Sequence, residues 1–336
     1  MKQIYLLECT LRDGGYITDW KFSDKCIKDI IASLIEANLD LIEVGYLNRN
    51  AKEKNTTLFS SVEKISEFLP TDRKGKTILA MADVTQFYPE DLTPYDGSSI
   101  DGIRVVFYKH QANQAIKLCR KINEMDYKLF VQPMVTIDYT VEEYTQLISS
   151  LCSLNPCAVS IVDSFGYMNK EDFRTYFEIL NDQLSHKAMV GFHSHNNMNL
   201  AFITAQDVME YETERKLVID CSLYGMGRGA GNLQTELITN YYNMCFQKRY
   251  NISEILRLIS EYIMPVYTNK RWGYSPYFLL TGLCHCHPNF ASYLLQEYDV
   301  SVSEFEKYVQ LIPDDMKTKC RKPYVIDLFR QSFYNN

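Results

Sequence analysis

The chain has 336 residues, 46% of them hydrophobic, which is enough for one large folded domain with an appendage. Its 35 basic and 42 acidic residues leave a formal charge of −7 without a long basic block, so we expect no nucleic-acid and no membrane partner. No window approaches about 18 consecutive apolar residues, and early charges interrupt any signal-peptide core. The ten cysteines lack paired spacing, which favours reduced thiols and a cytoplasmic location.

Eight short apolar runs, each typical of a buried strand, recur along most of the chain. They span residues 4–9, 39–45, 77–82, 102–107, 128–135, 158–163, 188–193 and 216–223. Amphipathic segments typical of helices lie between them, and Ser23, Thr140 and Asn169 stand where helix N-caps are expected. Apolar strands that alternate with helices predict a parallel sheet covered on both faces.

We interpret these repeats as an α/β fold, an eight-stranded parallel β/α (TIM) barrel. The alternative is a doubly wound open sheet, whose usual Gly-x-Gly-x-x-Gly turn after the first strand is absent, because the turn here reads TLRDGGYITDW. The later part of the chain has a helical pattern. We therefore predict a catalytic barrel over residues 1–248 and a C-terminal helical extension over 249–336, which contributes to the active-site mouth or to a partner interface.

Polar residues follow several of the apolar runs, at the end of the barrel where catalytic side chains gather. Glu43 ends the second run, and His193 and His195 end the seventh in VGFHSHNN. Residues two apart on an extended segment share a face, so these histidines could hold one cation together. Asp13, in the turn after the first run, is the natural carboxylate partner, and Arg12 beside it would be a fixed donor for an oxyanion.

Each of these residues also has a plainer interpretation. The histidines could be core residues, the Arg-Asp-Gly-Gly sequence a surface turn, and Glu43 a structural carboxylate paired with a basic group. The loop GMGRGAGN could be a flexible connection, or it could cover a substrate and direct Asn232 at the metal region. The CHCHPN segment lacks the spacing of a zinc finger, but His287 is a candidate acid or base if the extension folds over the barrel mouth.

Six segments, in order and spacing, resemble one superfamily: TLRDGG, IEVGY, IRVVF, IVDSFG, HSHNNMNLA and GMGRGAGN. They are similar to the metal-dependent lyases and synthases of the HMG-CoA lyase-like (DRE-TIM) superfamily, over roughly residues 3–245, and most of all to its 4-hydroxy-2-oxovalerate aldolase branch. The resemblance implies that Asp13, His193 and His195 bind a divalent cation, Mn²⁺ or Mg²⁺ being usual and Zn²⁺ or Co²⁺ the alternatives. It also implies that Arg12 stabilises an enolate oxygen. The substrate-binding candidates are Glu43, Ser164 and Asn232.

Two positions depart from the aldolase branch. A histidine that follows the Arg-Asp-Gly turn in that branch and serves as acid and base is replaced here by Tyr16. By spacing, a tyrosine of the branch's C-terminal part is replaced by His287. Because the two residue types are exchanged, Tyr16 and His287 are both candidates for the proton-transfer group.

The resemblance implies an enzyme, a carbon–carbon lyase that cleaves or forms a 4-hydroxy-2-oxo acid through the enolate of pyruvate held by the metal, with an aldehyde as the other product. A Claisen-type acyl-CoA synthase or lyase would share the metal site. The missing turn histidine favours another class, a catalytically silent metal-binding or regulatory barrel. A third alternative is an unrelated barrel enzyme with a coincidental His-x-His. In the aldolase relatives the extension docks a dehydrogenase that consumes the aldehyde, so the expected partner is an aldehyde dehydrogenase or a second copy of this chain.

Overall fold

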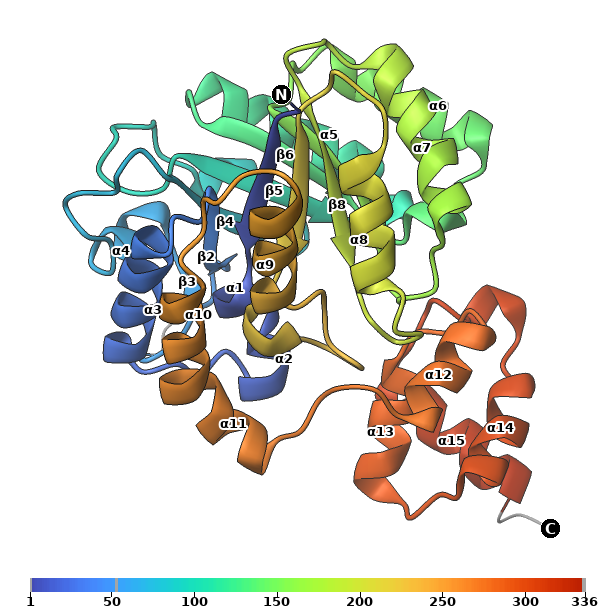
Figure 1. Cartoon of the computed structure of the whole chain (residues 1–336). Helices are drawn as coiled ribbons and strands as arrows, with labels where there is room; N and C mark the ends of the chain where they lie inside the picture. The colour runs from blue at the N-terminus through green and yellow to red at the C-terminus, as the bar shows by residue number, and fades with distance from the viewer. Residues whose placement is uncertain (1, 52–53, 334–336) are drawn as a thin grey trace.

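The computed structural model describes residues 2–51 and 54–333. Its parallel strands follow the order β1-β9-β8-β7-β6-β5-β4-β2-β3, and β1 also pairs with β2, which closes the sheet into a barrel (Figure 1). The two-residue β3 lies outside the closed ring, on the edge of β2. The strands are β1 Ile4–Glu8, β2 Leu41–Leu47, β3 Leu58–Phe59, β4 Thr77–Asp83, β5 Gly102–Phe107, β6 Lys128–Pro133, β7 Ala158–Asp163, β8 Met189–Ser194 and β9 Leu217–Cys221. The predicted eight-stranded barrel is therefore confirmed, with strand ends shifted by a few residues.

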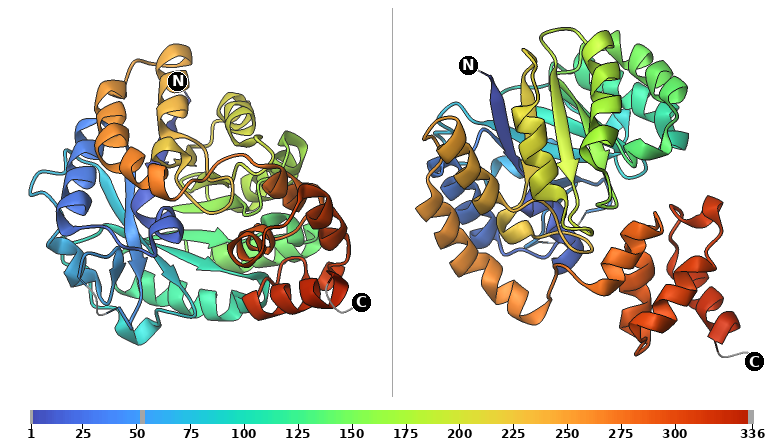
Figure 2. Two further views of the ribbon diagram at one scale, coloured as in Figure 1. Left: turned by 90° about the horizontal axis from the view of Figure 1, so that it is seen from below. Right: turned by 45° about the vertical axis from the view of Figure 1, so that its right-hand side comes forward.

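Helices surround the barrel, and a second group of helices continues the chain beyond it (Figures 1 and 2). The early helices are α1 Thr10–Asp13, α2 Gly15–Thr18, α3 Asp24–Glu36, α4 Val62–Ser66, α5 Ala112–Glu124, α6 Val141–Cys152, α7 Lys170–Gln183, α8 Ala201–Glu210 and α9 Thr235–Cys245. The later ones are α10 Ile252–Leu258, α11 Met264–Asn269, α12 Pro276–Leu283, α13 Asn289–Glu297, α14 Val302–Gln310 and α15 Lys322–Phe333.

The three predicted N-caps are confirmed. Ser23, Thr140 and Asn169 each accept a hydrogen bond from a backbone N–H in the first turn of the helix that follows. Thr140 and Glu143 also form the reciprocal bonds of a capping box. These local signals could be identified in the sequence because each needs only residues three positions apart.

The turn after β1 differs from the expectation of a surface turn. Residues 10–15 are buried and Tyr16 is exposed, and the segment forms two successive helical turns, α1 and α2. Gly14 has an ordinary helical φ of −62°, so its backbone does not require glycine. The space around Gly14 does require glycine, because an added Cβ would lie 2.5 Å from the Thr10 carbonyl oxygen and 2.8 Å from the Met226 sulfur. This close packing seats Arg12 and Asp13 inside the barrel mouth.

The barrel interior is layered because side chains alternate along each strand. One layer is apolar and includes Leu41, Phe130 and Val218. Two residues further along these strands, on the same face, stand Glu43, Gln132 and Asp220, all buried. A buried polar layer therefore lies at the C-terminal side of the apolar one. This polar layer supports the site described below.

Two clusters of apolar side chains divide the chain. The larger one extends from the barrel through α10 to Trp272, and the smaller one joins residues of α12 to α15. Helices α10 and α11 thus belong with the barrel wall, whereas α12–α15 form a separate lobe beside the C-terminal strand ends (Figure 2). The boundary after residue 248 stays a prediction. In the described part of the chain, no helix has the length and apolar character needed to cross a membrane.

Candidate metal centre and active site

Asp13 and His193 come together at the C-terminal mouth of the barrel although 180 positions separate them in the sequence. Asp13 ends α1, His193 lies in β8, and the Asp13 Oδ2 and His193 Nε2 atoms are 3.7 Å apart. His195 follows β8 directly, and its ring centroid lies 5.2 Å from that of His193. All three side chains are buried. The structure therefore brings all three proposed metal ligands to one mouth. Among the described residues, however, the ligand atoms that lie within 4.8 Å of one another belong to Cys9, Asp13 and His193, and His195 lies outside that group.

Asp220 fixes the orientation of His193. Its Oδ2 atom lies 3.0 Å from His193 Nδ1, and the same oxygen accepts from Arg104 at 2.5 Å and from Gln132 at 3.3 Å. A carboxylate at Nδ1 places the ring proton there, which leaves Nε2 with a free lone pair directed toward Asp13. Metal-binding histidines are commonly oriented by a carboxylate in this way.

The remaining donor atoms fit a divalent cation. Among the described residues, His195 Nδ1 and Asn232 Oδ1 are buried polar atoms without a hydrogen-bond partner. Burial lowers the pKa of His195 to about 3, so its ring is neutral and offers a lone pair. Burial raises the pKa of Asp13, but Arg12 and the two histidines outweigh this effect and hold it below its ordinary value, so the carboxylate is ionised. Two imidazoles, one carboxylate and an amide oxygen are suitable ligands for Mn²⁺, Zn²⁺ or Co²⁺.

Cys9, which was not a candidate in the sequence analysis, also belongs to this cluster. Its Sγ atom, an Asp13 oxygen and a His193 nitrogen all lie within 4.8 Å of one another. Burial raises the pKa of the thiol well above its ordinary value, and the thiol donates to the Cys221 carbonyl at 3.2 Å. Cys9 is therefore a neutral neighbour of the centre.

Arg12 and Glu43 complete a closed chain of charged contacts around the centre. Arg12 Nη1 lies 2.7 Å from Asp13 Oδ1, and Arg12 Nε lies 2.7 Å from Glu43 Oε2. Arg104 Nη1 lies 3.1 Å from the same Glu43 oxygen, and Arg104 reaches on to Asp220. Since Asp220 holds His193, the ring of contacts returns to Asp13. Removing one member leaves a buried charge without its partner.

The sequence analysis did not identify Asp220, Gln132 or Arg104 as site residues. Each lies within an apolar strand and is buried inside the barrel. The available signal was a charged or amide residue inside a run such as LVIDC, because such a residue needs a buried partner. Its partner could not be identified without the barrel, since the two belong to different strands.

Asn232 lies beside Asp13, as the interpretation of the glycine-rich loop predicted. Its Nδ2 donates to Asp13 Oδ2, and its backbone bridges to His195. Ser164 does not lie beside Asp13 but in the loop after β7. Its hydroxyl accepts from the Val135 backbone N–H at 2.9 Å and so ties the loop after β7 to the loop after β6.

Tyr16 lies at the rim of the mouth, on α2. Its hydroxyl is 3.1 Å from that of Tyr46, and the Arg228 guanidinium lies 5.2 Å from its ring centroid. Burial raises the pKa of Tyr46 well above its ordinary value, and the nearby Tyr16 adds to this shift. The Tyr46 hydroxyl is therefore neutral, and it lies near Arg12.

His287 reaches the barrel from the C-terminal lobe. It is buried, its ring centroid lies 5.1 Å from that of Phe165, and its Nδ1 accepts from the Asn289 backbone N–H at 3.0 Å. Burial, then Arg228 and His195, lower the pKa of His287 well below its ordinary value. The ring is therefore neutral and carries its proton on Nε2.

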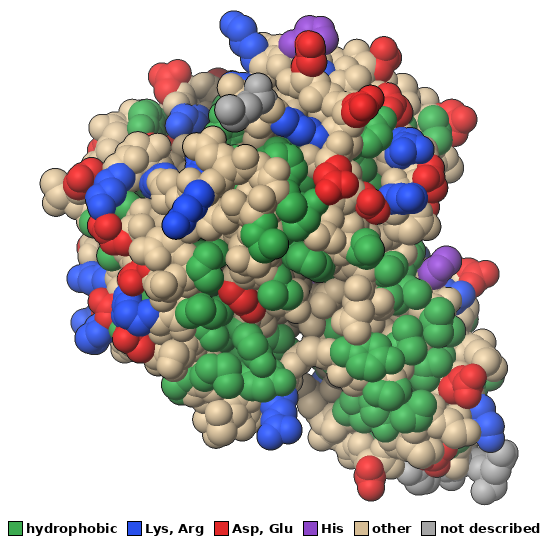
Figure 3. Space-filling model, in the orientation of Figure 1, with side chains coloured by type: hydrophobic (Ala, Val, Ile, Leu, Met, Phe, Trp, Pro, Cys, Tyr) green, Lys and Arg blue, Asp and Glu red, His purple; other side chains and the backbone are tan. Residues whose placement is uncertain are grey.

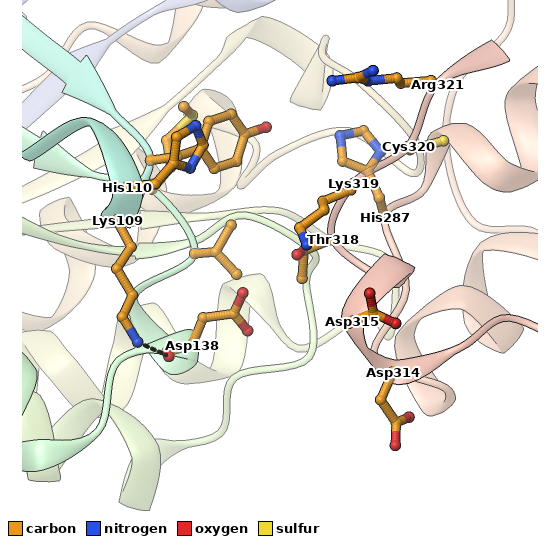
Figure 4. Close-up of a pocket in the computed structure, with 13 residues that line it drawn as sticks. Lys109, His110, Asp138, His287, Asp314, Asp315, Thr318, Lys319, Cys320 and Arg321 are labelled. Carbon is orange, nitrogen blue, oxygen red and sulfur yellow. Dashed lines mark hydrogen bonds between the residues drawn. The ribbon is translucent and has the colours of Figure 1, made fainter. Parts of the chain in front are cut away.

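A cleft of about 900 Å³ opens between the barrel mouth and the C-terminal lobe, with His287 in its wall (Figure 4). Lys109, His110 and Asp138 project from the barrel side, and residues 314–315 and 318–321 line the lobe side. A cleft of this size accommodates a small organic molecule, but of the proposed site residues only His287 lines it, and none of the proposed metal ligands does.

Comparisons with known proteins agree with this geometry. Residues 103–261 match the HMGL-like family. The chain is 26% identical to a 4-hydroxy-2-oxovalerate aldolase of Carboxydothermus hydrogenoformans, over 79% of this chain and 78% of that protein. It is also 26% identical to a 4-hydroxy-2-oxovalerate aldolase of Geobacillus genomosp. 3, over 70% of this chain and 69% of that protein.

Solved structures extend the likeness. The N-terminal domain of a proposed aldolase from Bacteroides vulgatus superposes with a TM-score of 0.75 at 26% identity, over 88% of this chain and 97% of that one. The HMG-CoA lyase of Bacillus subtilis shares the fold, with a TM-score of 0.64 at 15% identity over 79% and 94% of the two chains. The chain is thus a TIM barrel that is similar to the HMGL-like family over residues 103–261.

Proposed function

We propose that this protein is a divalent-metal-dependent aldolase that cleaves or forms a 4-hydroxy-2-oxo acid, with pyruvate and an aldehyde as the cleavage products. The observation that carries the proposal is the pairing of Asp13 with a His193 whose ring Asp220 orients. The similar proteins named 4-hydroxy-2-oxovalerate aldolase support it. Asp13, His193, His195 and Asn232 would hold Mn²⁺ or Mg²⁺, with Zn²⁺ or Co²⁺ as alternatives. When bound, the cation acts as a Lewis acid on a 2-oxo acid.

Arg12 is the residue proposed to stabilise the enolate oxygen. Glu43 and Asp13 occupy its Nε and Nη1 atoms, whereas Nη2, although buried, has no hydrogen-bond partner within the described residues. A fixed guanidinium with one uncommitted N–H group suits an oxygen on which negative charge develops. Glu43 then has a positioning role, because Arg12 and Arg104 surround it.

His287 and Tyr16 remain the two candidates for proton transfer. The bond from Asn289 selects the His287 tautomer with its proton on Nε2, so in this state His287 donates a hydrogen bond to a substrate oxygen. Acceptance of a proton from the 4-hydroxyl group requires the other tautomer. Tyr16 is linked to Tyr46 and lies under Arg228, and its position favours substrate orientation at the rim. Ser164 would shape the floor of the cleft through its bond to Val135.

The test is release of pyruvate from a panel of 4-hydroxy-2-oxo acids, after removal of metal by a chelator and again after addition of Mn²⁺. We expect metal-dependent release, and we expect Asp13→Ala and His193→Ala to lose both metal and activity. Release of thiol from acetyl-CoA with a 2-oxo acid would instead establish a Claisen-type synthase. Metal binding without turnover of any substrate in the panel would contradict the aldolase assignment.

We also propose a cytoplasmic location and a docking role for the C-terminal lobe. All ten cysteines are free thiols, which fits a reducing compartment. Hydrophobic side chains gather on the lobe surface (Figure 3). In α12, Leu283 is 55% exposed. An aldehyde dehydrogenase or a second copy of the chain would cover them. Sedimentation of the protein alone distinguishes the two, since only the second case gives a dimer.

A further inference from the structure

The N-terminal mouth of the barrel, opposite the candidate active site, has a concentration of basic residues. Lys76 directly precedes β4, Lys128 begins β6, Lys187 stands two residues before β8, and Lys216 directly precedes β9. Because all barrel strands are parallel, these residues meet at one end of the barrel. Arg249, from the segment after α9, joins them around a single cavity.

This cavity has a volume of about 410 Å³, within the range of small-molecule sites. Its wall and floor include Tyr5, Leu41, Phe130 and Met189, which are apolar or aromatic. Phe130 belongs to the apolar layer that separates this cavity from the polar layer of the active site. The two sites are therefore distinct and lie at opposite ends of the same barrel.

The charges at this mouth are unbalanced. Asp40 is the acidic residue in the cavity wall, and both of its oxygens are occupied: Oδ2 accepts from the Leu6 N–H at 3.0 Å and the Tyr250 hydroxyl at 2.6 Å, and Oδ1 pairs with Arg249. Lys128, Lys187 and Lys216 form no ion pair with any residue in the described ranges.

Such a cluster is unexpected in a chain with a formal charge of −7, because lysines gathered around one cavity repel one another. Burial also lowers the pKa of the half-buried Lys76; Asp40 opposes this shift, and Arg249 and Lys74 add to it. A bound anion would remove the repulsion.

We propose that the N-terminal mouth of the barrel binds a small organic polyanion of the nucleoside di- or triphosphate class. The lysines contact the phosphate groups, and the aromatic and apolar floor contacts the ring system. A multivalent anion is required because four lysines and Arg249 are opposed by Asp40 alone. The inference is independent of the proposed aldolase activity, since no residue of this cavity belongs to the metal centre.

The experiment is calorimetric titration of the chain with ADP, ATP, pyrophosphate and adenosine in the presence of a chelator, so that the metal centre cannot bind phosphate. We expect saturable binding of ADP or ATP, at least tenfold weaker binding of pyrophosphate, and no binding of adenosine. Absence of saturable nucleotide binding would overturn the proposal and would leave the lysines as partners of the helix C-termini at this end of the barrel.

Variants locate the site. Lys128→Gln with Lys187→Gln should weaken nucleotide binding at least tenfold. The matched control is Lys117→Gln with Lys307→Gln, two exposed lysines on α5 and α14 outside this cavity, which should bind as the wild type does. Asp13→Ala should also retain nucleotide binding. Equal loss in both double variants would mean that binding depends on overall charge, and would overturn the assignment to this mouth.

Discussion

His193 shows that the candidate centre depends on residues that would contact neither metal nor substrate. Its Nε2 atom is available because Asp220 holds Nδ1, and Asp220 is held in turn by Arg104 and Gln132. The sequence indicated the two histidines through their spacing. It did not indicate Asp220, because an aspartate inside a strand has no local feature that identifies its partner.

Substitution of Asp220 should therefore weaken metal binding. Asp220→Asn removes the negative charge that orients His193 and balances Arg104, and we expect an affinity for Mn²⁺ about 10- to 100-fold lower than that of the wild type. Competition with a chelating dye measures the affinity without reference to activity. Asp182→Asn, at an exposed position of α7, is the control. An unchanged affinity in Asp220→Asn would refute this role.

His287 should affect turnover and leave the metal in place. We expect His287→Ala to lower kcat by about 100-fold or more, the usual range for loss of a proton-transfer group, with the metal content unchanged. Steady-state pyruvate release and elemental analysis measure the two quantities. His186→Ala is the control, because His186 is an exposed histidine in the segment between α7 and β8. If His287→Ala turns over at the wild-type rate, Tyr16 becomes the candidate.

At the scale of elements, the loop after β7 is organised by one buried carboxylate. Asp163 accepts from the Tyr167 and Met168 backbone N–H groups at 3.1 and 3.2 Å. Ser164 ties the same loop to Val135, and Phe165 and Tyr167 contact the C-terminal lobe. The sequence showed that a strand ends in Asp163 but not that this carboxylate shapes the loop, since its bonds depend on the local backbone conformation.

The titration of Asp163 should make stability depend on pH. Burial raises its pKa from 3.8 to about 7, although the backbone N–H groups oppose the shift. Because the folded chain binds this proton more tightly than the unfolded chain, the stability it contributes is complete below about pH 4 and is lost as the pH rises through 7. The side chain of the Asp163→Asn variant cannot ionise. Between pH 4 and 8 its free energy of unfolding, measured in urea, should therefore rise by on the order of 2–4 kcal/mol relative to that of the wild type. The exposed Asp327→Asn should show no such relative gain; a parallel pH dependence of Asp163→Asn and the wild type would contradict the assignment.

At the scale of the whole molecule, the site needs both the barrel and the C-terminal lobe. The His287 ring packs at a tilt against Phe165, and the His285 ring stacks on Tyr167. An added Cβ on Gly282 would meet the Met198 side chain at 2.6 Å. These contacts place His287 at the mouth, in the wall of the cleft. The chain between α11 and α12, residues 270–275, connects the two parts.

Loss of the Tyr167 ring should loosen this docking. We expect Tyr167→Ala to lower turnover several-fold and to speed proteolysis within residues 270–275, while the metal content stays at the wild-type value. Limited proteolysis followed by mass spectrometry locates the cleavage. Tyr167→Phe keeps the ring that stacks on His285 and should behave as the wild type does. If both variants resist the protease equally, the stack does not hold the lobe in place.

The sequence by itself determined the barrel, the caps of its helices and the pair of histidines, because apolar period, N-cap residues and i, i+2 spacing are local properties. It also placed Asp13 and Asn232 near the histidines, once strand ends were assigned to one mouth. Only the tertiary structure decided that Arg12, Glu43, Arg104 and Asp220 form one ring of contacts with the centre, and that the lysines of four strand starts surround a second cavity. These arrangements join residues from different strands, and their energies depend on burial and distance, which arise only when the sheet closes.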